Sequence, residues 1–465
     1  MAKDGTHQER LIVGLLAGCG MLSSLQFTLM IPVLPRVPEM LGTTAPDAAW
    51  LITITLLVGV VGTPVITRLA DMHGRRRLLL TAMALLVTGS LIAAVIPGFI
   101  AVMIGRALQG FGTSVVPIGI ALMSTQVSRR LAIFGIAVMS GTLGIGSALG
   151  LAVAGPLVAW GGLTTIFWVS AAIGTTFFVL ILLRIREVPT SRPGSFDVPG
   201  AVLLTVGLAA LLLAISRGQL WGWTSPTTLW LFAISAAGLW IWLLWELRRP
   251  HPMIDVRIAM SSPILPINLA SFVATFGMYA NHLLTTQEAL APAATGYGVA
   301  AAPAAVGLFL LPSALVMVVL APLTARVITR HGSRFALLLG ASIMTAAFLF
   351  RMAVHGQPAA IIAGSALVGT GVSFAFASMP SLITASVPRD QVASANGVNS
   401  VVRTLSGAVA AALFALLIAT LPASGDSAYL SEPALRIAFA TAALCGGATI
   451  LIAAALRLPH PQEPA

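Results

Sequence analysis

Long apolar stretches make up nearly the whole chain, and short polar loops, many of which carry arginine, separate them. Each stretch is close to the ~20 residues that an α-helix needs to cross the hydrocarbon core of a bilayer. Only 8% of the residues are charged and 58% are hydrophobic, whereas a soluble domain carries about 25% charged residues because water must wet its surface. The sequence therefore predicts an all-α polytopic membrane protein whose outer surface faces lipid.

Fourteen spans result when this length is applied along the chain. They are expected at roughly residues 11–33, 48–67, 78–97, 99–123, 131–158, 163–183, 199–216, 227–245, 263–290, 302–326, 335–355, 358–380, 393–420 and 435–456. If the N-terminus is inside, the arginine-rich loops also fall inside, as the positive-inside rule requires. An even number of spans then predicts that both termini are cytoplasmic. The bias toward alanine and arginine is typical of a GC-rich bacterial genome, so the expected location is the bacterial inner membrane.

Two groups of six spans flank a linker that holds the two remaining spans. The predicted boundaries are 1–183 for an N-terminal six-helix bundle, 184–262 for the linker with two additional helices, and 263–465 for a C-terminal six-helix bundle. The charged junction 67–77 of the first group returns as 326–334 in the second. A repeat of this kind is typical of transporters that are built from two related halves.

The net charge of +11 does not indicate a nucleic-acid partner. The arginines form short groups between apolar runs, and no continuous basic face exists that could follow a phosphate backbone. The two cysteines, Cys19 and Cys445, lie within apolar spans, so a zinc or disulfide framework is not expected. No phosphate-binding loop or nucleophile elbow is found. The sequence predicts neither an enzyme nor a bound cofactor or metal. The energy for transport must therefore come from an ion gradient or from the concentration gradient of the substrate.

Several motifs resemble those of the Major Facilitator Superfamily, and within it the fourteen-helix drug:proton antiporter family. The run from Leu69 to Arg76, with Asp71 and Gly74, is similar to the signature of the loop between helices 2 and 3, although Thr67 replaces its leading glycine. The run from Arg106 to Gly112 resembles the fourth-helix signature of proton-coupled members. The two extra spans between the halves resemble the fourteen-helix group.

Two further motifs resemble the family but depart from it. The glycines from Gly141 to Gly155 are similar to the fifth-helix signature of antiporters, but the expected Gly-Pro pair reads Gly150-Leu151. The run from Leu25 to Pro35 resembles the first-helix signature, which carries an aspartate where this chain has Gln26. Because glutamine cannot titrate, this change weakens the case for a cationic substrate and moves proton coupling elsewhere.

The resemblance implies two six-helix bundles around a pseudo-twofold axis, with two peripheral helices. It also implies multidrug efflux: a proton-coupled exporter of hydrophobic or amphipathic small molecules, such as antibiotics, that functions as a monomer by alternating access. Asp71, Gly74, Arg75 and Arg76 are expected to control an inner gate, where an acid pairs with an arginine and with a helix N-terminus. Gly146, Gly150 and Gly155 are expected to let helices approach closely and slide.

Charged residues within the spans are candidates for proton coupling. Arg106 lies about eight residues into its span, roughly 12 Å deep, where a charge is functional by default. Glu288 is the best membrane-embedded acid, with His282 as a second proton carrier. The open alternative places Glu288 at the extracellular mouth, solvated and passive. The predicted substrate cavity consists of Gln26, Met30, Arg106, Gln109, Asn281, Asn399 and Arg403.

Two other functions remain open from the residues alone. One is a narrow-specificity exporter of a metabolite or natural product, with an anionic substrate as one option, because the intramembrane Arg106 and Arg403 outnumber the embedded acids. The other is a non-transporting membrane sensor or scaffold, although a sensor needs a soluble domain to signal to. For Asn399 and Arg403, which share a helical face, cavity lining and contact between helices are equally supported.

Overall fold

The structure is a computed structural model. It describes residues 2–187, 196–249, 252, 254, 256–262, 264–302, 305–388, 391–423 and 426–456. Part of the predicted linker, residues 188–195, lies outside the described residues.

The first half consists of six membrane-spanning segments and two short turns at one end. The elements are α1 (Ala2–Leu29), η1 (Leu34–Arg36), α2 (Val37–Leu41), α3 (Ala45–His73), α4 (Arg75–Val95), α5 (Phe99–Gly110), η2 (Phe111–Ser114), α6 (Val115–Gln126), α7 (Arg129–Gly161) and α8 (Leu163–Arg184). The helices α5 and α6 form one span through η2.

The linker and the second half continue the same plan. The elements are α9 (Val198–Trp221), α10 (Pro226–Arg248), α11 (Val256–Ala259), α12 (Ile264–Leu290), η3 (Ala293–Thr295), α13 (Val306–Val319), α14 (Ala321–His331), α15 (Ser333–Ala353), α16 (Pro358–Ser386), α17 (Val392–Thr420), β1 (Pro422–Ala423), β2 (Asp426–Leu430) and α18 (Glu432–Ala455). The two strands form a small antiparallel hairpin between α17 and α18.

In the part of the chain that the structure describes, thirteen segments are long and apolar enough to span a membrane. The bent pair α13 and α14, which meet at 46°, makes a fourteenth if it is counted as one span. Every predicted span has a counterpart, so the predicted all-α polytopic fold is confirmed. Large apolar side chains such as Trp160 (84% exposed) and Leu444 (73% exposed) point outward, as expected of a surface that meets lipid.

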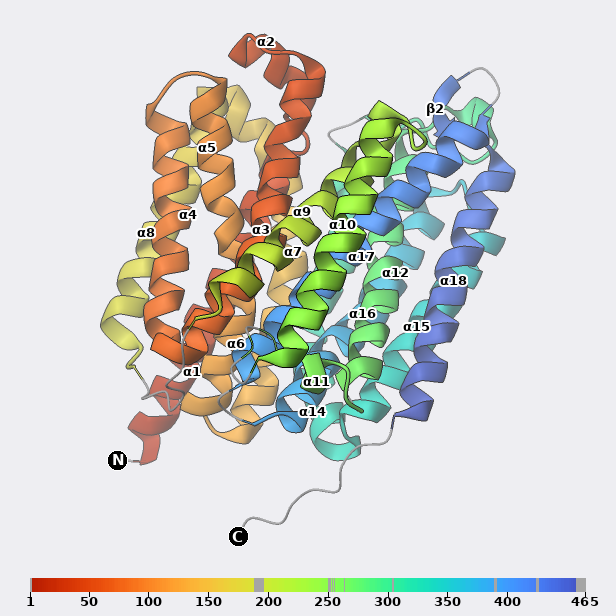
Figure 1. Cartoon of the computed structure of the whole chain (residues 1–465). Helices are drawn as coiled ribbons and strands as arrows, with labels where there is room; N and C mark the ends of the chain where they lie inside the picture. The colour runs from red at the N-terminus through yellow and green to blue at the C-terminus, as the bar shows by residue number, and fades with distance from the viewer. Residues whose placement is uncertain are drawn as a thin grey trace.

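Two bundles stand side by side with both termini at the same end (Figure 1). In the first, α1 packs on α7, and α4 packs on α5 and α8; in the second, α15 packs on α16 and α18, and α12 packs on α17 and α18. The halves meet mainly through α7 with α13 and through α3 with α17. The linker helices α9 and α10 pack on each other, and α9 contacts both α3 and α17, so the linker covers the junction between the halves.

The predicted end of the second span near residue 67 is wrong by about two helical turns. Helix α3 continues to His73, and a single residue, Gly74 with φ +113°, separates it from α4. Asp71 therefore lies in the last turn of a helix rather than in a loop. The second half repeats this arrangement, because α14 continues to His331 and Gly332 has φ +85°. The sequence did not reveal these helix ends, because the last turns carry charged residues and the hydropathy therefore falls several residues before the helix ends.

Candidate functional site

A cavity of about 830 Å³ lies between the two bundles. Helices α1, α3 and α7 line it from the first half, and α12, α13, α16 and α17 line it from the second. Ile31, Pro156, Leu290 and Ile418 are among its lining residues, and all lie near the helix ends that are opposite to the two chain termini. The cavity therefore extends from between the bundles toward that opposite end.

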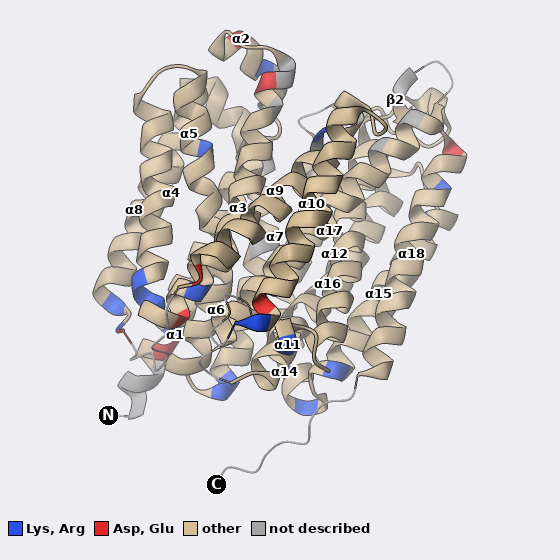
Figure 2. Ribbon diagram, in the orientation of Figure 1, with Lys and Arg blue, Asp and Glu red and all other residues tan. Residues whose placement is uncertain are grey.

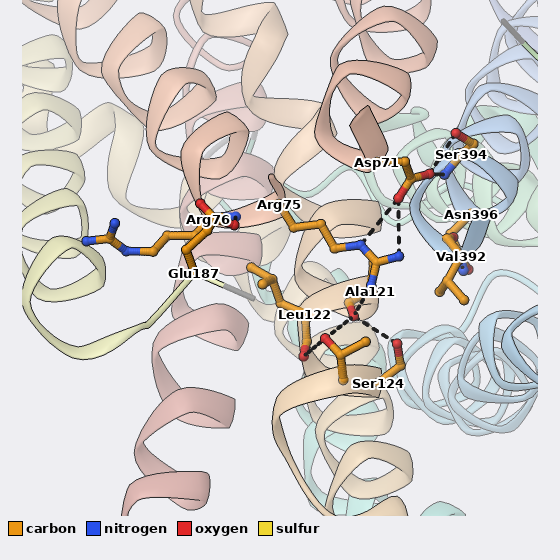
Figure 3. A network of polar contacts seen from close by, with 11 residues as sticks. Asp71, Arg75, Arg76, Ala121, Leu122, Ser124, Glu187, Val392, Ser394 and Asn396 are labelled. Atoms are coloured by element: carbon orange, nitrogen blue, oxygen red, sulfur yellow. Dashed lines mark hydrogen bonds and ion pairs between the residues drawn. The ribbon is translucent and has the colours of Figure 1, made fainter. Parts of the chain in front are cut away.

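At the end that holds the termini, Asp71 joins the two halves (Figure 3). Its Oδ2 accepts hydrogen bonds from the backbone N–H of Ser394 (2.9 Å) and from the Ser394 hydroxyl (2.8 Å). Ser394 lies in the first turn of α17, where backbone N–H groups are free and negative charge is favoured. Asp71 Oδ1 pairs with Arg75 Nη2 at 3.2 Å, and Arg75 Nη1 donates to the carbonyl of Ala121 at 3.1 Å. The sequence predicted the type of partner but not Ser394 itself.

The other two predicted gate residues, Gly74 and Arg76, act within the first half. The Glu187 carboxylate accepts the backbone N–H groups of Arg76 (3.1 Å) and Arg77 (3.0 Å) at the start of α4. The guanidinium of Arg76 points away from Asp71 (Figure 3) and donates to the carbonyl of Leu182 at 2.7 Å. An added Cβ at Gly74 would lie 2.8 Å from Glu187. These contacts hold α4 against the end of α8.

Close approach between α3 and α17 also depends on Gly397, which was not a predicted site residue. An ideal Cβ at Gly397 would lie 3.1 Å from the Cβ of Thr67, the residue that replaces the leading glycine of the signature. The glycine that this contact requires therefore lies on α17, as Gly397, rather than on α3, where the signature has it.

Arg106 is buried inside the first bundle and does not line the cavity. Its Nε donates to the carbonyl of Leu51 (3.1 Å), and its Nη1 donates to the carbonyl of Gln26 and to Gln109 Oε1 (both 2.9 Å). Gln109 in turn donates to the hydroxyl of Ser90 at 2.8 Å. Among described residues, Arg106 Nη2 and Gln26 Oε1 have no hydrogen-bond partner. Arg106, Gln26 and Gln109 thus form one polar network between helices.

A second buried arginine, Arg351 of α15, was not predicted as a site residue. It is 0% exposed and forms an ion pair with Glu288, which is 1% exposed. Its Nη1 donates to Asn281 Oδ1 (2.6 Å) and to the hydroxyl of Thr285 (3.0 Å). The guanidinium also lies 4.9 Å from the centre of the Phe439 ring. Glu288 is therefore buried and paired, so the alternative of a solvated side chain at the mouth is wrong.

The signal for this pair was present but weak. Arg351 is a single charge four residues before the predicted end of its span, a place where long side chains commonly reach the interface. Only the contacts of Arg351 with Asn281, Thr285 and Glu288 of α12 show that its side chain turns inward.

Three of the residues predicted for the substrate cavity or for proton coupling line the cavity: Asn281, His282 and Arg403. The guanidinium carbon of Arg403 lies 3.9 Å above the centre of the Phe376 ring. Asn399 instead donates to Asn268 Oδ1 (3.0 Å) and to the hydroxyl of Ser271 (2.7 Å), which ties α17 to α12. Met30 is fully buried in an apolar cluster of the first bundle. Gln26, Met30, Arg106, Gln109 and Asn399 do not belong to the lining.

The predicted glycines of α7 differ in their surroundings. An added Cβ at Gly146 would overlap the carbonyl oxygen of Met21, and one at Gly150 would overlap the hydroxyl of Thr28. Both glycines thus allow α7 to touch α1. Gly155 has nothing within 4 Å of its ideal Cβ and lines the cavity. Within the described ranges, no group of three or more His, Cys, Asp or Glu side chains could hold a metal ion.

A central cavity between two helical bundles, with a charged contact closing one end, defines a polytopic membrane transporter. The family model described as Major Facilitator Superfamily matches residues 16–411 and 267–465. The chain belongs to the Major Facilitator Superfamily, as its motifs predicted.

Curated relatives and a solved structure agree with this assignment. The multidrug resistance protein Stp of Mycobacterium tuberculosis is 26% identical over 89% of this chain and 76% of its own length. The tetracenomycin C resistance and export protein of Streptomyces glaucescens is 24% identical over 86% and 74%. The crystal structure of the human organic anion transporter MFSD10 matches 97% of this chain and 99% of its own, with a TM-score of 0.67 and 17% identity, which supports the fold.

Proposed function

We propose that this protein is a proton-coupled exporter that moves hydrophobic or amphipathic small molecules by alternating access. The observation that carries the proposal is the cavity between the bundles, which is closed at one end by the contact of Asp71 with Ser394. Relatives named for multidrug resistance and for export of tetracenomycin C support a drug-like substrate. The same proposal takes residues 1–183 and 263–465 as the two moving bundles and 184–262 as their linker, and a monomer as the working unit.

We further propose that both termini are cytoplasmic, in a bacterial inner membrane. Figure 2 shows that most Lys and Arg gather at the end of the molecule that holds the termini, which supports this orientation by the positive-inside rule. The cavity of the described conformation then faces outward, and the contacts of Asp71 and Arg75 form the closed inner gate.

The proposed proton carrier is Glu288. Burial in a low-dielectric interior favours its neutral form, whereas the ion pair with Arg351 favours its charged form. A proton that binds Glu288 would therefore release Arg351 and weaken the polar contacts that join α12 to α15. Asn281 connects this pair to the cavity, because it lines the cavity and also accepts a hydrogen bond from Arg351. His282 is a second candidate carrier. Arg106 contacts Gln26, which stands where the first-helix signature has an aspartate, so we propose that Arg106 stabilises the first bundle rather than carrying out proton coupling.

The second candidate is a narrow-specificity exporter of a metabolite or natural product, with an anionic substrate. One observation supports it: Arg403 lines the cavity, and none of the described lining residues is Asp or Glu, so the cavity suits a negatively charged molecule.

The test is proton movement in energised inside-out vesicles, monitored with a pH-sensitive dye while cationic, neutral and anionic amphiphiles are added in turn. We expect wild type to release protons when a substrate is added, and Glu288→Gln to lose this response. Glu39→Gln, which removes an exposed acid of α2, is the matched control and should behave as wild type.

Two results would change the proposal. An equal response from Glu288→Gln would keep exchange but move the proton to His282. Silence of correctly inserted wild type toward all three classes would contradict drug:proton exchange, and it would favour a narrow metabolite carrier or a non-transporting sensor or scaffold.

A further inference from the structure

We infer that the substrate carries an anionic group and that Arg403 binds this group in the central cavity. The inference deepens the proposed function, since it takes the cavity as the substrate site and adds the charge of its occupant.

Three arginines inside the helical core have different surroundings. Arg106 donates one hydrogen bond each to the neighbouring helices α3 and α1 and a third to Gln109 of its own helix, and Arg351 pairs with the carboxylate of Glu288. Arg403 has neither: in the described chain, its guanidinium stacks on Phe376 but makes no hydrogen bond or ion pair. Arg403 is half-buried on the cavity wall, and a cation at membrane depth is costly unless a counter-charge, polar groups or water compensate it. Of the three, Arg403 is the one without a hydrogen-bonding or charged partner among the described residues, so its guanidinium is free to bind an anion that enters the cavity.

The position of Arg403 directs its free donors to the cavity. It lies eleven residues into α17, about 16 Å from the helix start at the helical rise of ~1.5 Å per residue, and so near the middle of the membrane. The guanidinium carbon lies 3.9 Å from the centre of the Phe376 ring. A guanidinium that stacks on an aromatic face keeps its N–H groups at the edge, where they can bind a carboxylate or sulfonate in a bidentate manner.

The rest of the lining has no competing charge. Arg403 is the sole Lys or Arg among the described lining residues, and Asp and Glu are absent from them. The second half adds polar groups near it, including Tyr279 and His282, whose rings lie 6.3 Å apart in an edge-on arrangement. The first half contributes apolar side chains such as Phe27 and Leu56 together with several hydroxyl groups.

The cavity therefore suits an amphiphile with one charged end. An anionic head group would bind beside Arg403 on α17, and an apolar body would pack on lining side chains of both halves, such as Phe27 of α1 and Leu310 of α13. A lipophilic cation would meet Arg403 with no Asp or Glu among the described lining residues to balance its charge, so the cavity discriminates against it.

The experiment measures binding by purified protein in nanodiscs of neutral lipid, without a proton gradient. Three probes share a naphthalene body: 2-naphthalenesulfonate, 2-naphthalenemethanol and a naphthylmethyl trimethylammonium salt. We expect wild type to bind the sulfonate at least tenfold more tightly than the alcohol, and the ammonium salt most weakly. In Arg403→Gln the sulfonate should lose this tenfold advantage, and Arg403→Lys should retain part of it.

A second variant guards against misfolding of Arg403→Gln. Ser400→Glu places a carboxylate one helical turn before Arg403, at a position that also lines the cavity. It should abolish the preference for the sulfonate and raise the affinity for the ammonium salt. Arg326→Gln, which removes an exposed arginine from α14, is the matched control and should bind all three probes as wild type does.

Equal affinity of wild type for the three probes, or tighter binding of the ammonium salt, would overturn the inference. So would an unchanged sulfonate preference in folded Arg403→Gln. Because the binding experiment needs no proton gradient, it separates the two proposals. Proton release by a cationic substrate in vesicles would keep the exporter and reject the anionic substrate. Sulfonate binding that depends on Arg403 but is not accompanied by proton movement in vesicles would reject proton coupling and keep the anionic substrate.

Discussion

The pairing of Glu288 with Arg351 decides what each residue contributes to stability. Removing one partner of a buried ion pair leaves an uncompensated charge and costs about 3–5 kcal/mol, whereas replacing both by neutral side chains is often tolerated. We expect Glu288→Gln to lower the free energy of unfolding by this amount, and Glu288→Gln combined with Arg351→Met to recover most of it. Denaturant titration of the protein in mixed detergent micelles measures both variants.

The double-mutant cycle on Glu288 and Arg351 also separates stability from transport. The double variant should fold well but lose substrate-triggered proton release, because no carboxylate remains to take the proton. If the two single losses of stability simply add in the double variant, the two residues do not interact, and the pairing seen here is not the one that matters in the membrane.

Residue partners were the least predictable feature of this sequence. The need of Asp71 for an arginine and a helix N-terminus was predicted, because it follows from charge and from the motif. Its partner Ser394 lies 323 residues away. A membrane helix is apolar on nearly all sides, so its hydrophobic pattern does not show which face meets a distant helix. Arg351 was missed for the same reason, since the burial of a single charge depends on which helix face meets a neighbour.

At the scale of helices, the spans could be predicted because a bilayer forces every backbone hydrogen bond to be made within the helix. Length and hydropathy then suffice, and all fourteen expected spans are present in the structure. The junctions could not be placed as well. At Gly74 and Gly332 the turn takes a single residue with positive φ, and the charged helix ends before it look like loops.

The same two junctions show how closely the halves repeat each other. Two residues after Gly74, Arg76 donates to the carbonyl of Leu182 near the end of α8. Two residues after Gly332, Arg334 donates to the carbonyls of Ala453 and Ala454 at the end of α18. An arginine at the same offset thus binds the free carbonyls of the last helix in each bundle, a match that the sequence showed only as a similar cluster of charges.

The contact between α1 and α7 gives a prediction for single glycines. Gly146→Ala and Gly150→Ala should destabilise the protein by about 1–3 kcal/mol each, since the added methyl group meets backbone or side-chain oxygens of α1. Gly155→Ala should be tolerated, because the space around its Cβ is open. Thermal unfolding in detergent compares the three variants. A loss at Gly155 as large as that at Gly146 would contradict packing as the reason for these glycines.

For the whole molecule, the contact of Gly397 with Thr67 affects the balance between conformations. A methyl group at residue 397 would press on the Thr67 side chain and weaken the closed end of the cavity without touching the cavity itself. Every 1.4 kcal/mol of strain changes the ratio of two states about tenfold. We expect Gly397→Ala to increase the population in which the end that holds the termini is open.

The distance between the halves reports this change. Spin labels at positions 130 and 330, two exposed arginines of α7 and α14, can be placed in a background without Cys19 and Cys445. The distance distribution should gain a longer component in Gly397→Ala. Gly447→Ala, which adds a methyl group to α18 where nothing lies within 4 Å, is the matched control. An unchanged distribution in Gly397→Ala would mean that the α3–α17 contact does not control opening.

Among the described residues that line the cavity, Arg403 carries the one guanidinium and none is Asp or Glu. This charge pattern affects the electrical work of transport. Exchange of one proton for a singly charged cation moves no net charge across the bilayer. Exchange of one proton for a singly charged anion moves two charges in the same electrical direction, each worth about 2.3 kcal/mol per 100 mV. With an inside-negative voltage, both the entering proton and the leaving anion move downhill. Arg403 would thus make the membrane potential, rather than the pH difference alone, a main driving force for export.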